Sequence, residues 1–172
     1  MFTKNFKNLM VLNLLNVRDN SGYVDETTTP EYKTIDGMPV INKNNTLHGA
    51  LSLASALSDT LKVTSDTAAT SWLIIGTGTG TVSENDYCLF NQDSNCACVS
   101  AASSTTSNLT KSYTATFQNN SESDVTITET GVVGECWLYN DWFTILLEHT
   151  LLETPVIIPA GGTRTITYVW SF

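Results

Sequence analysis

Apolar and polar residues alternate along the end of the chain. After Arg164, every second residue is aliphatic or aromatic, namely Ile166, Tyr168, Trp170 and Phe172. The residues between them are Thr165, Thr167, Val169 and Ser171. A period of two in β-branched and aromatic residues predicts a half-buried β-strand and does not fit a helix.

The same alternation recurs through the second half of the chain. It predicts strands at residues 72–75, 113–117 and 125–128, and one or two long strands over 137–150 that continue through 153–158. Turn residues separate these strands at 119–124, 140–141 and 159–162. Residues 91–108, rich in Ser, Thr, Ala and Cys, are expected to form a loop. We expect the turn at 159–162 to place the last strand antiparallel to residues 156–158.

The first third of the chain has a weaker pattern. Residues 1–20 hold a short apolar patch whose periodicity fits a helix or an extended segment. Asp36-Gly37 predicts a hairpin turn, in which Pro39 restricts the second strand to an edge. Residues 47–61 are the one stretch with helical character, although Leu51-Ser-Leu53 also alternates.

These patterns together predict an all-β chain. We expect residues 63–172 to form an antiparallel β-sandwich of the jelly-roll or Ig-like kind. Residues 1–62 are expected to form an N-terminal arm, partly extended and with a short helix. The apolar groups of residues 6–17 would then suit the surface of a neighbouring subunit.

The charge balance bears on partners. Lys and Arg number 8 against 17 Asp and Glu, which gives a net charge of −9. This acidity argues against a nucleic-acid partner, because phosphate binding needs clustered Lys and Arg. Residues 1–17 imitate a signal peptide, but Asn13 and Asn16 interrupt the apolar stretch and no small-residue cleavage site follows. No stretch reaches the length of a membrane span, so we expect no membrane partner.

The four cysteines are Cys88, Cys96, Cys98 and Cys136. Cys96-Ala-Cys98 is too tight for a zinc knuckle, and His48 and His149 have no partner at ligand spacing. We expect free thiols, as in a protein that matures in a reducing cytosol, with a disulfide as the alternative. The sequence predicts no metal-binding residues.

The glycine-rich segment Gly76-Thr-Gly-Thr-Gly80 follows an apolar strand but completes no phosphate-binding motif. A P-loop ends in Gly-Lys-Ser/Thr, and the dinucleotide fingerprint needs glycine where this chain has Thr81. The glycines are therefore interpreted as a turn or bulge between strands, and no cofactor-binding residues or cofactor are predicted.

The chain contains residue types that enzymes use in catalysis, but their spacing matches no catalytic motif. The acidic candidates Glu129, Glu135, Asp141, Glu148 and Glu153 include no distinctive pair and are expected to be solvated. His149 is interpreted as a sheet-face residue, and no Gly-x-Ser-x-Gly elbow exists. The aromatic residues Trp137, Tyr139, Trp142 and Phe143 suit core or interface packing, with a sugar-stacking surface as the alternative. The sequence thus predicts no catalytic residues and no enzyme.

A series of motifs runs in order through residues 72–172. They are Ile75-Gly-Thr-Gly78, Ser83-Glu-Asn-Asp-Tyr-Cys-Leu89, Thr116-Phe-Gln-Asn119, Ile127-Thr-Glu-Thr-Gly131, Leu146-Leu-Glu148, and Pro155-Val-Ile-Ile-Pro-Ala-Gly161 with Thr165-Ile-Thr-Tyr168. Their order and number resemble a theme of virion proteins from tailed bacteriophages. The chain departs from that theme at Val132-Val-Gly134, where an apolar–aromatic pair is common, and in residues 91–108.

The resemblance implies a β-sandwich building block of a tail, fibre, neck or capsid-decorating assembly, without catalytic residues. The expected function is therefore structural: a symmetric homo-oligomer in a virion, made in the host cytoplasm, with itself and other virion proteins as partners. The alternatives are a receptor- or glycan-binding module of a phage fibre, which would contact host-surface glycans, and a secreted bacterial adhesin.

Overall fold

The computed structural model describes residues 1–7, 32–40, 71–107, 110–138 and 141–171. This part of the chain has an all-β fold, to which residues 4–7 add one helical turn. The strands are β1 (Tyr32–Lys33), β2 (Pro39–Val40), β3 (Ser71–Gly76), β4 (Cys96–Ser107), β5 (Thr110–Asn119), β6 (Val125–Leu138), β7 (Asp141–Ile158) and β8 (Thr163–Ser171).

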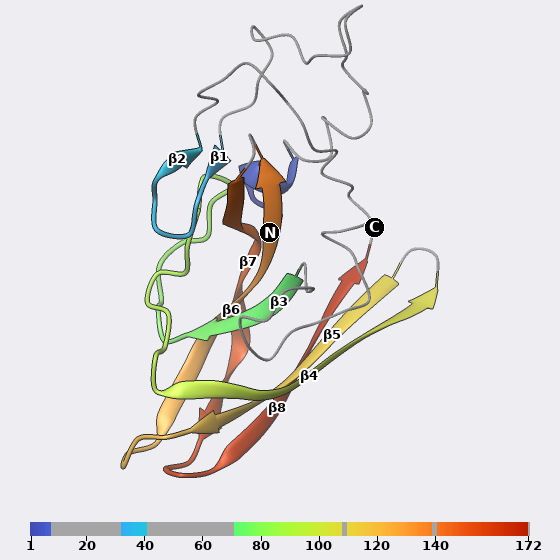
Figure 1. Cartoon of the computed structure of the whole chain (residues 1–172). Helices are drawn as coiled ribbons and strands as arrows, with labels where there is room; N and C mark the ends of the chain where they lie inside the picture. Colours follow the sequence, from blue (N-terminus) through green and yellow to red (C-terminus); the bar gives the residue numbers. More distant parts are fainter. Residues whose placement is uncertain (8–31, 41–70, 108–109, 139–140, 172) are drawn as a thin grey trace, which may run out of the picture.

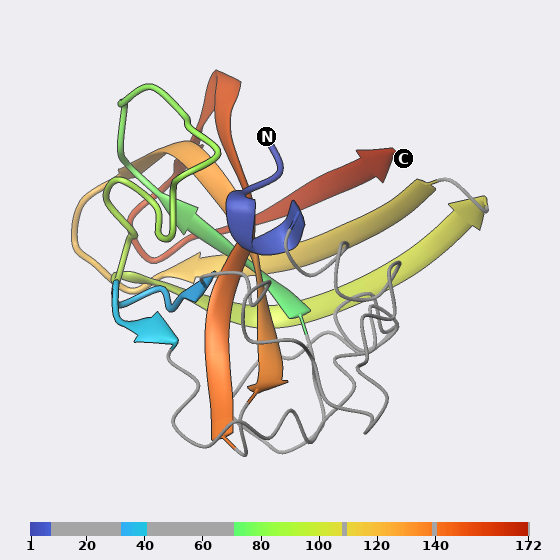
Figure 2. The same cartoon turned by 90° about the horizontal axis from the view of Figure 1, so that it is seen from above.

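The strands form two three-stranded antiparallel sheets and one small hairpin. The order is β3-β6-β7 in the first sheet and β4-β5-β8 in the second. We name them the β6 sheet and the β5 sheet after their central strands. Strands β1 and β2 pair with each other. Figure 1 and Figure 2 show the β5 sheet crossing the β6 sheet, with the far ends of β4 and β5 extending beyond the other strands.

One hydrophobic core contains side chains from both sheets. Residues of the two central strands meet in it, among them Tyr113 and Phe117 of β5 and Ile127 and Val132 of β6. Its other buried members are Phe6, Leu73, Ile75, Cys96, Ala115, Ile145, Leu147, Ile158 and Ile166. Removing this apolar surface from water provides most of the free energy that stabilises such a fold.

The opposite face of the β6 sheet is also covered. A second cluster joins Ile74, Val133 and Leu146 of the sheet to Leu89 of the loop at residues 77–95. Ile35, in the β1–β2 turn, packs against this cluster. Burial on both faces explains why the consecutive residues Ile145, Leu146 and Leu147 are all fully buried, since a strand covered on both sides carries a continuous apolar run.

The alternation identified most of the strands correctly. Strands β3, β5 and β8 and the start of β6 lie where it predicts them, and the long β7 continues to Ile158 as expected. The predicted hairpin at Asp36-Gly37 is present as β1 and β2, with Gly37 at φ 77° and Pro39 in a two-stranded sheet. Positive φ is the conformation for which glycine is favoured.

The expected loop at residues 91–108 is a correction. Residues 96–107 form β4, which pairs with β5 over its whole length and has register shifts at Cys98/Ser100 and Thr105/Ser107. These residues lack the large apolar side chains that reveal a strand by alternation. Backbone pairing with β5 defines this strand instead.

The pairing of the last strand is a second correction. Residues 159–162 do form a turn, in which the Gly162 N–H donates to the Pro159 carbonyl at 2.8 Å. However, β8 pairs with β5, with Tyr113 opposite Tyr168, and not with residues 156–158. The turn therefore carries the chain from one sheet to the other, which brings Ile166 into the core from the β5 sheet.

The start of the chain packs on its own sheets. The sequence predicted that apolar groups from residue 6 onward face a neighbouring subunit, but Phe6 is only 3% exposed and belongs to the core. The Thr3 hydroxyl donates to the Leu146 carbonyl at 2.7 Å, which fixes this segment on β7. The predicted helix at 47–61 and the boundary near residue 63 lie outside the described residues.

Candidate functional site

A buried histidine stands between two carboxylates. His149, on β7, is fully buried, and its Nε2 lies 2.8 Å from Oε2 of Glu129 on β6. Its Nδ1 lies 2.7 Å from Oδ2 of Asp86, which comes from the 77–95 loop. The three side chains join two strands and a loop, and we call them the Asp86–His149–Glu129 cluster.

Glu129 is held by the backbone of the loop. Its carboxylate accepts hydrogen bonds from the N–H groups of Gly78 at 2.9 Å, Phe90 at 3.0 Å and Asn91 at 2.8 Å. Burial raises the pKa of this fully buried acid, but these hydrogen bonds and the one from His149 outweigh it and lower the pKa below its ordinary value. Glu129 is therefore ionised at neutral pH.

The position of Asp86 is set by a tight turn of the loop. Its carboxylate accepts the Ser83 N–H at 2.9 Å, while its own N–H donates to the Ser83 carbonyl at 3.1 Å. The side chain is 14% exposed, so it lies at the rim of the buried cluster.

Both ring nitrogens of His149 have a carboxylate partner. One nitrogen faces an oxygen of Glu129 and the other faces an oxygen of Asp86. A buried polar side chain with a partner on each side avoids the cost of burying an unsatisfied group.

Glycines at the end of β3 and in the 77–95 loop allow the backbone to approach the Glu129 carboxylate. A Cβ atom added at Gly76 or at Gly78 would lie 2.5 Å from Oε1 of Glu129, closer than real contacts allow. The sequence interpretation of a turn between strands is therefore incomplete, because these glycines also make room for a buried acid. Phe90 adds a ring 4.7 Å from the His149 ring, centroid to centroid.

The arrangement fixes a loop to a sheet. Each carboxylate oxygen of Glu129 has hydrogen-bond donors, and both His149 nitrogens are occupied. The nearby Cys88 is a poor nucleophile, because burial first and then the charges of Asp86 and Glu129 raise its pKa. Among the described residues, no group of three His, Cys, Asp or Glu side chains is arranged to hold a metal ion.

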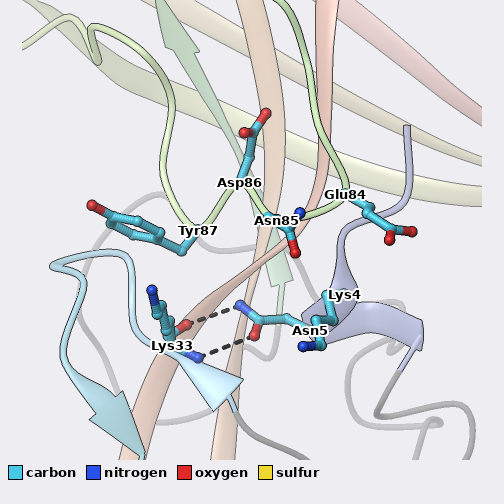
Figure 3. A pocket seen from close by; sticks show the side chains of 7 residues that line it. All are labelled: Lys4, Asn5, Lys33, Glu84, Asn85, Asp86 and Tyr87. Atoms are coloured by element: carbon cyan, nitrogen blue, oxygen red, sulfur yellow. Dashed lines mark hydrogen bonds between the residues drawn. The ribbon is translucent and has the colours of Figure 1, made fainter.

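A small pocket of about 150 Å³ adjoins the cluster at Asp86. It lies where the N-terminal segment, β1 and the 77–95 loop meet, and it is lined by Lys4, Asn5, Lys33, Glu84, Asn85, Asp86 and Tyr87 (Figure 3). The Asn5 side chain donates to the Lys33 carbonyl at 2.9 Å and accepts the Lys33 N–H at 3.1 Å. The Lys33 ammonium lies 5.2 Å from the centre of the Tyr87 ring. The Asp86 carboxylate turns away from Lys33 and Asn5 (Figure 3).

The acidic residues that the sequence analysis named differ in burial. Glu129 and Glu148 are buried, which corrects the expectation that the acids are solvated, whereas Glu153 is exposed. Glu148 accepts a hydrogen bond from the Thr150 hydroxyl at 2.6 Å and contacts the amino group of Met1. The side chains of Glu135 and Asp141 lie outside the description. Of the aromatic set, the structure describes only the side chain of Phe143, which packs against the core.

Sequence reasoning missed the cluster, although two of its members carried a signal. Glu129 has the same sequence parity as Ile127, and His149 has the parity of Leu147 in the apolar run at residues 145–147. Both positions indicated a buried polar side chain. Asp86 had no such signal because it lies in a loop. Cys88, Cys96 and Cys98 are free thiols, and the side chain of Cys136 lies outside the description.

Comparisons of this chain with protein-family models, curated proteins and solved structures gave no match. Among the described residues, no helix is long and apolar enough to cross a membrane.

Proposed function

We propose that this chain is a structural subunit of a tailed-bacteriophage virion. In this proposal it is made in the host cytoplasm and assembles as a symmetric homo-oligomer with other virion proteins, in the tail, neck or fibre or on the capsid. The two sheets form a β-sandwich of the jelly-roll or Ig-like kind. Residues 1–62 serve as an N-terminal arm for assembly, although residues 1–7 also contact their own sheets.

One observation carries the proposal: the motifs that resemble phage virion proteins meet in the Asp86–His149–Glu129 cluster. Gly78 ends the first motif, Asp86 lies within the second, and Glu129 lies within Ile127-Thr-Glu-Thr-Gly131. His149 directly follows Leu146-Leu-Glu148. Segments far apart in sequence are thus joined by hydrogen bonds of 2.7–2.9 Å. This supports the view that the motifs form one structural unit.

The chemistry of the cluster supports a structural role. Its side chains are hydrogen-bonded to one another and to backbone N–H groups, and these bonds hold the 77–95 loop on the β6 sheet. A subunit of a particle benefits from a fixed surface, because repeated copies must present the same contacts to each neighbour. The sandwich is supported by the core, which takes buried side chains from both sheets.

A mass-spectrometric inventory of purified phage particles, with and without their tails, tests the proposal. We expect the chain to co-purify with particles at a constant ratio to the major capsid protein. Its loss from tailless particles would assign it to the tail, and its retention would assign it to the head. A chain that is made during infection but is missing from purified particles would rule the proposal out.

A further inference from the structure

The four outer edges of the two sheets are protected to different degrees. An unpaired edge strand offers free N–H and C=O groups to any other strand, and soluble proteins cover such edges, shorten them or place charges on them. On the β7 edge, the Thr3 N–H donates to the Leu147 carbonyl at 3.1 Å, and the Ile35 N–H donates to the Thr144 carbonyl at 3.0 Å. The β3 edge has only 6 residues, and the Asp93 N–H donates to its Ile75 carbonyl at 3.0 Å.

The β5 sheet has edges at β4 and β8. Strand β8 has 9 residues and carries Arg164, whose Nε donates to the Ile157 carbonyl at 3.2 Å. Strand β4 has 12 residues, none of them charged and none of them proline. Among the described residues, only β5 pairs with β4, so its outer edge is the longest one without a protective device.

The distribution of charge distinguishes the same region. Copies of a chain with a net charge of −9 repel one another, so they associate most easily where acidic residues are missing. Residues 94–121 form the longest stretch without Asp or Glu, and their one charged residue is Lys111. This stretch includes β4 and β5, whose far ends extend beyond the other strands (Figure 1).

We propose that the outer edge of β4 pairs antiparallel with the β4 edge of a second copy of this chain. The inference rests on the homo-oligomer of the proposed function and names its contact. Two three-stranded sheets would join across a two-fold axis into one continuous sheet. Such an isologous contact closes on itself. A contact between β4 and the β8 of a copy in the same orientation would instead pair parallel strands, which are slightly less stable, and would stay open at both ends.

The test uses the full chain in the presence of a reductant, so that Cys96 and Cys98 form no disulfides between copies. Sedimentation velocity and light scattering should show a dimer that dissociates on dilution. The variant Val99→Lys/Ser100→Lys adds two charges at exposed positions of β4, and it should weaken dimerisation at least about tenfold. The matched variant Thr165→Lys/Thr167→Lys adds the same charge at exposed positions of β8, and it should leave the dimer intact.

Hydrogen exchange provides a measurement that needs no variant. The β4 amides should gain protection as the concentration of the wild-type chain rises, while the β8 amides should not change.

Three results would overturn the inference. They are a monomer at all concentrations, a dimer weakened only by the β8 variant, and β4 protection that does not depend on concentration. A wild-type chain that stays monomeric in solution yet enters particles would overturn the inference and leave the virion role intact. A dimer of the expected kind that is missing from particles would instead contradict the virion role.

Discussion

The imidazole of His149 and the carboxylate of Glu129 are hydrogen-bonded across neighbouring strands, with Nε2 and Oε2 2.8 Å apart and both side chains fully buried. The same carboxylate receives three backbone N–H groups of the 77–95 loop. The pair therefore links β6 and β7 to the segment that covers them. Removing this pair should therefore lower the stability of the fold.

Replacement of the buried acid should destabilise the protein strongly. Glu129→Gln keeps the shape of the side chain but replaces an ionised carboxylate with an amide, whose NH2 group cannot accept the backbone N–H groups that now point at it. A buried donor left without its acceptor costs about 1–3 kcal/mol, and more where a charged group was the partner. Urea denaturation measures this loss. The control Glu153→Gln, at an exposed position of β7, should change the free energy of unfolding by less than about 0.5 kcal/mol. Equal stability of the two variants would show that the cluster contributes nothing.

Two glycines of the same loop provide a matched pair of substitutions. A Cβ atom at Gly78 would lie 2.4 Å from Cβ of Phe90 and 2.5 Å from Oε1 of Glu129, so Gly78→Ala must displace the loop or the buried acid. We expect a loss of about 2 kcal/mol or more, as in overpacked cores. At Gly80 the nearest atoms, at 2.8 Å, are at the far end of the exposed Phe90 ring, which can move away. Thermal unfolding should therefore rank Gly80→Ala as clearly the milder change.

The cluster should also make stability depend on pH in the acid range. The pKa of Glu129 in the folded protein lies below its ordinary value of 4.5. Between these two pKa values the unfolded state binds more protons than the folded state, so stability falls as the pH falls. The contribution of Glu129 is thus fully present above about pH 4.5 and is lost as the pH falls through the lower, folded pKa. Denaturant titrations from neutral to acid pH should show this decline. Glu129→Gln should have a shallower slope, and an identical slope would contradict the assignment.

The sequence predicted the strands that alternate and missed the one that does not. Strand β5 buries every second side chain from Tyr113 to Asn119, and in β8 the buried Ile166 and the half-buried Tyr168 alternate with exposed residues, so their pattern identifies both strands. Strand β4 consists of small residues with no such contrast, and only its pairing with β5 defines it.

The pairing of β8 and the contact of Asp86 with His149 could not be predicted from the sequence for a common reason, because neither depends on a local pattern. A turn between consecutive strands suggests a hairpin, but whether the chain stays in one sheet depends on where the core lies. Asp86 reaches His149 across 63 residues of sequence, and no local pattern encodes that contact. Glu129 was accessible to sequence reasoning, because an acid at the apolar positions of a strand signals a paired, buried charge.

The thiols should differ in reactivity in the native protein. Burial, followed by a hydrogen bond with Asp93 and its charge, raises the pKa of Cys96 from 9.0 to about 12. At a given pH near 8 this lowers the thiolate fraction about a thousandfold, so Cys96 should be alkylated far more slowly in the native protein than in the denatured chain. Peptide mapping after timed alkylation measures the rate.

Intact mass after alkylation under denaturing, non-reducing conditions should show four adducts, and two or none would indicate disulfides.

The final strand should be required for folding, through β5 rather than β7. A chain that stops after Gly162 loses one of the two strands that pair with β5, along residues 110–118, together with the buried Ile166 and the half-buried Tyr168. Burial of such side chains is worth roughly 1.5–3 kcal/mol each, and the net stability of a domain is about 5–15 kcal/mol. We therefore expect the truncated chain to be insoluble when expressed alone.

The opposite face of β8 supplies the control for this truncation. Thr165 and Thr167 are exposed, and their hydroxyls lie 2.8 Å and 3.1 Å from those of Thr116 and Thr114 on β5. Thr165→Ser and Thr167→Ser keep these hydroxyls and remove no buried group, so the melting temperature should hardly change. A soluble truncated chain that melts cooperatively would show that the β5 sheet folds without β8. In that case β8 would contribute to assembly and not to the stability of its own chain.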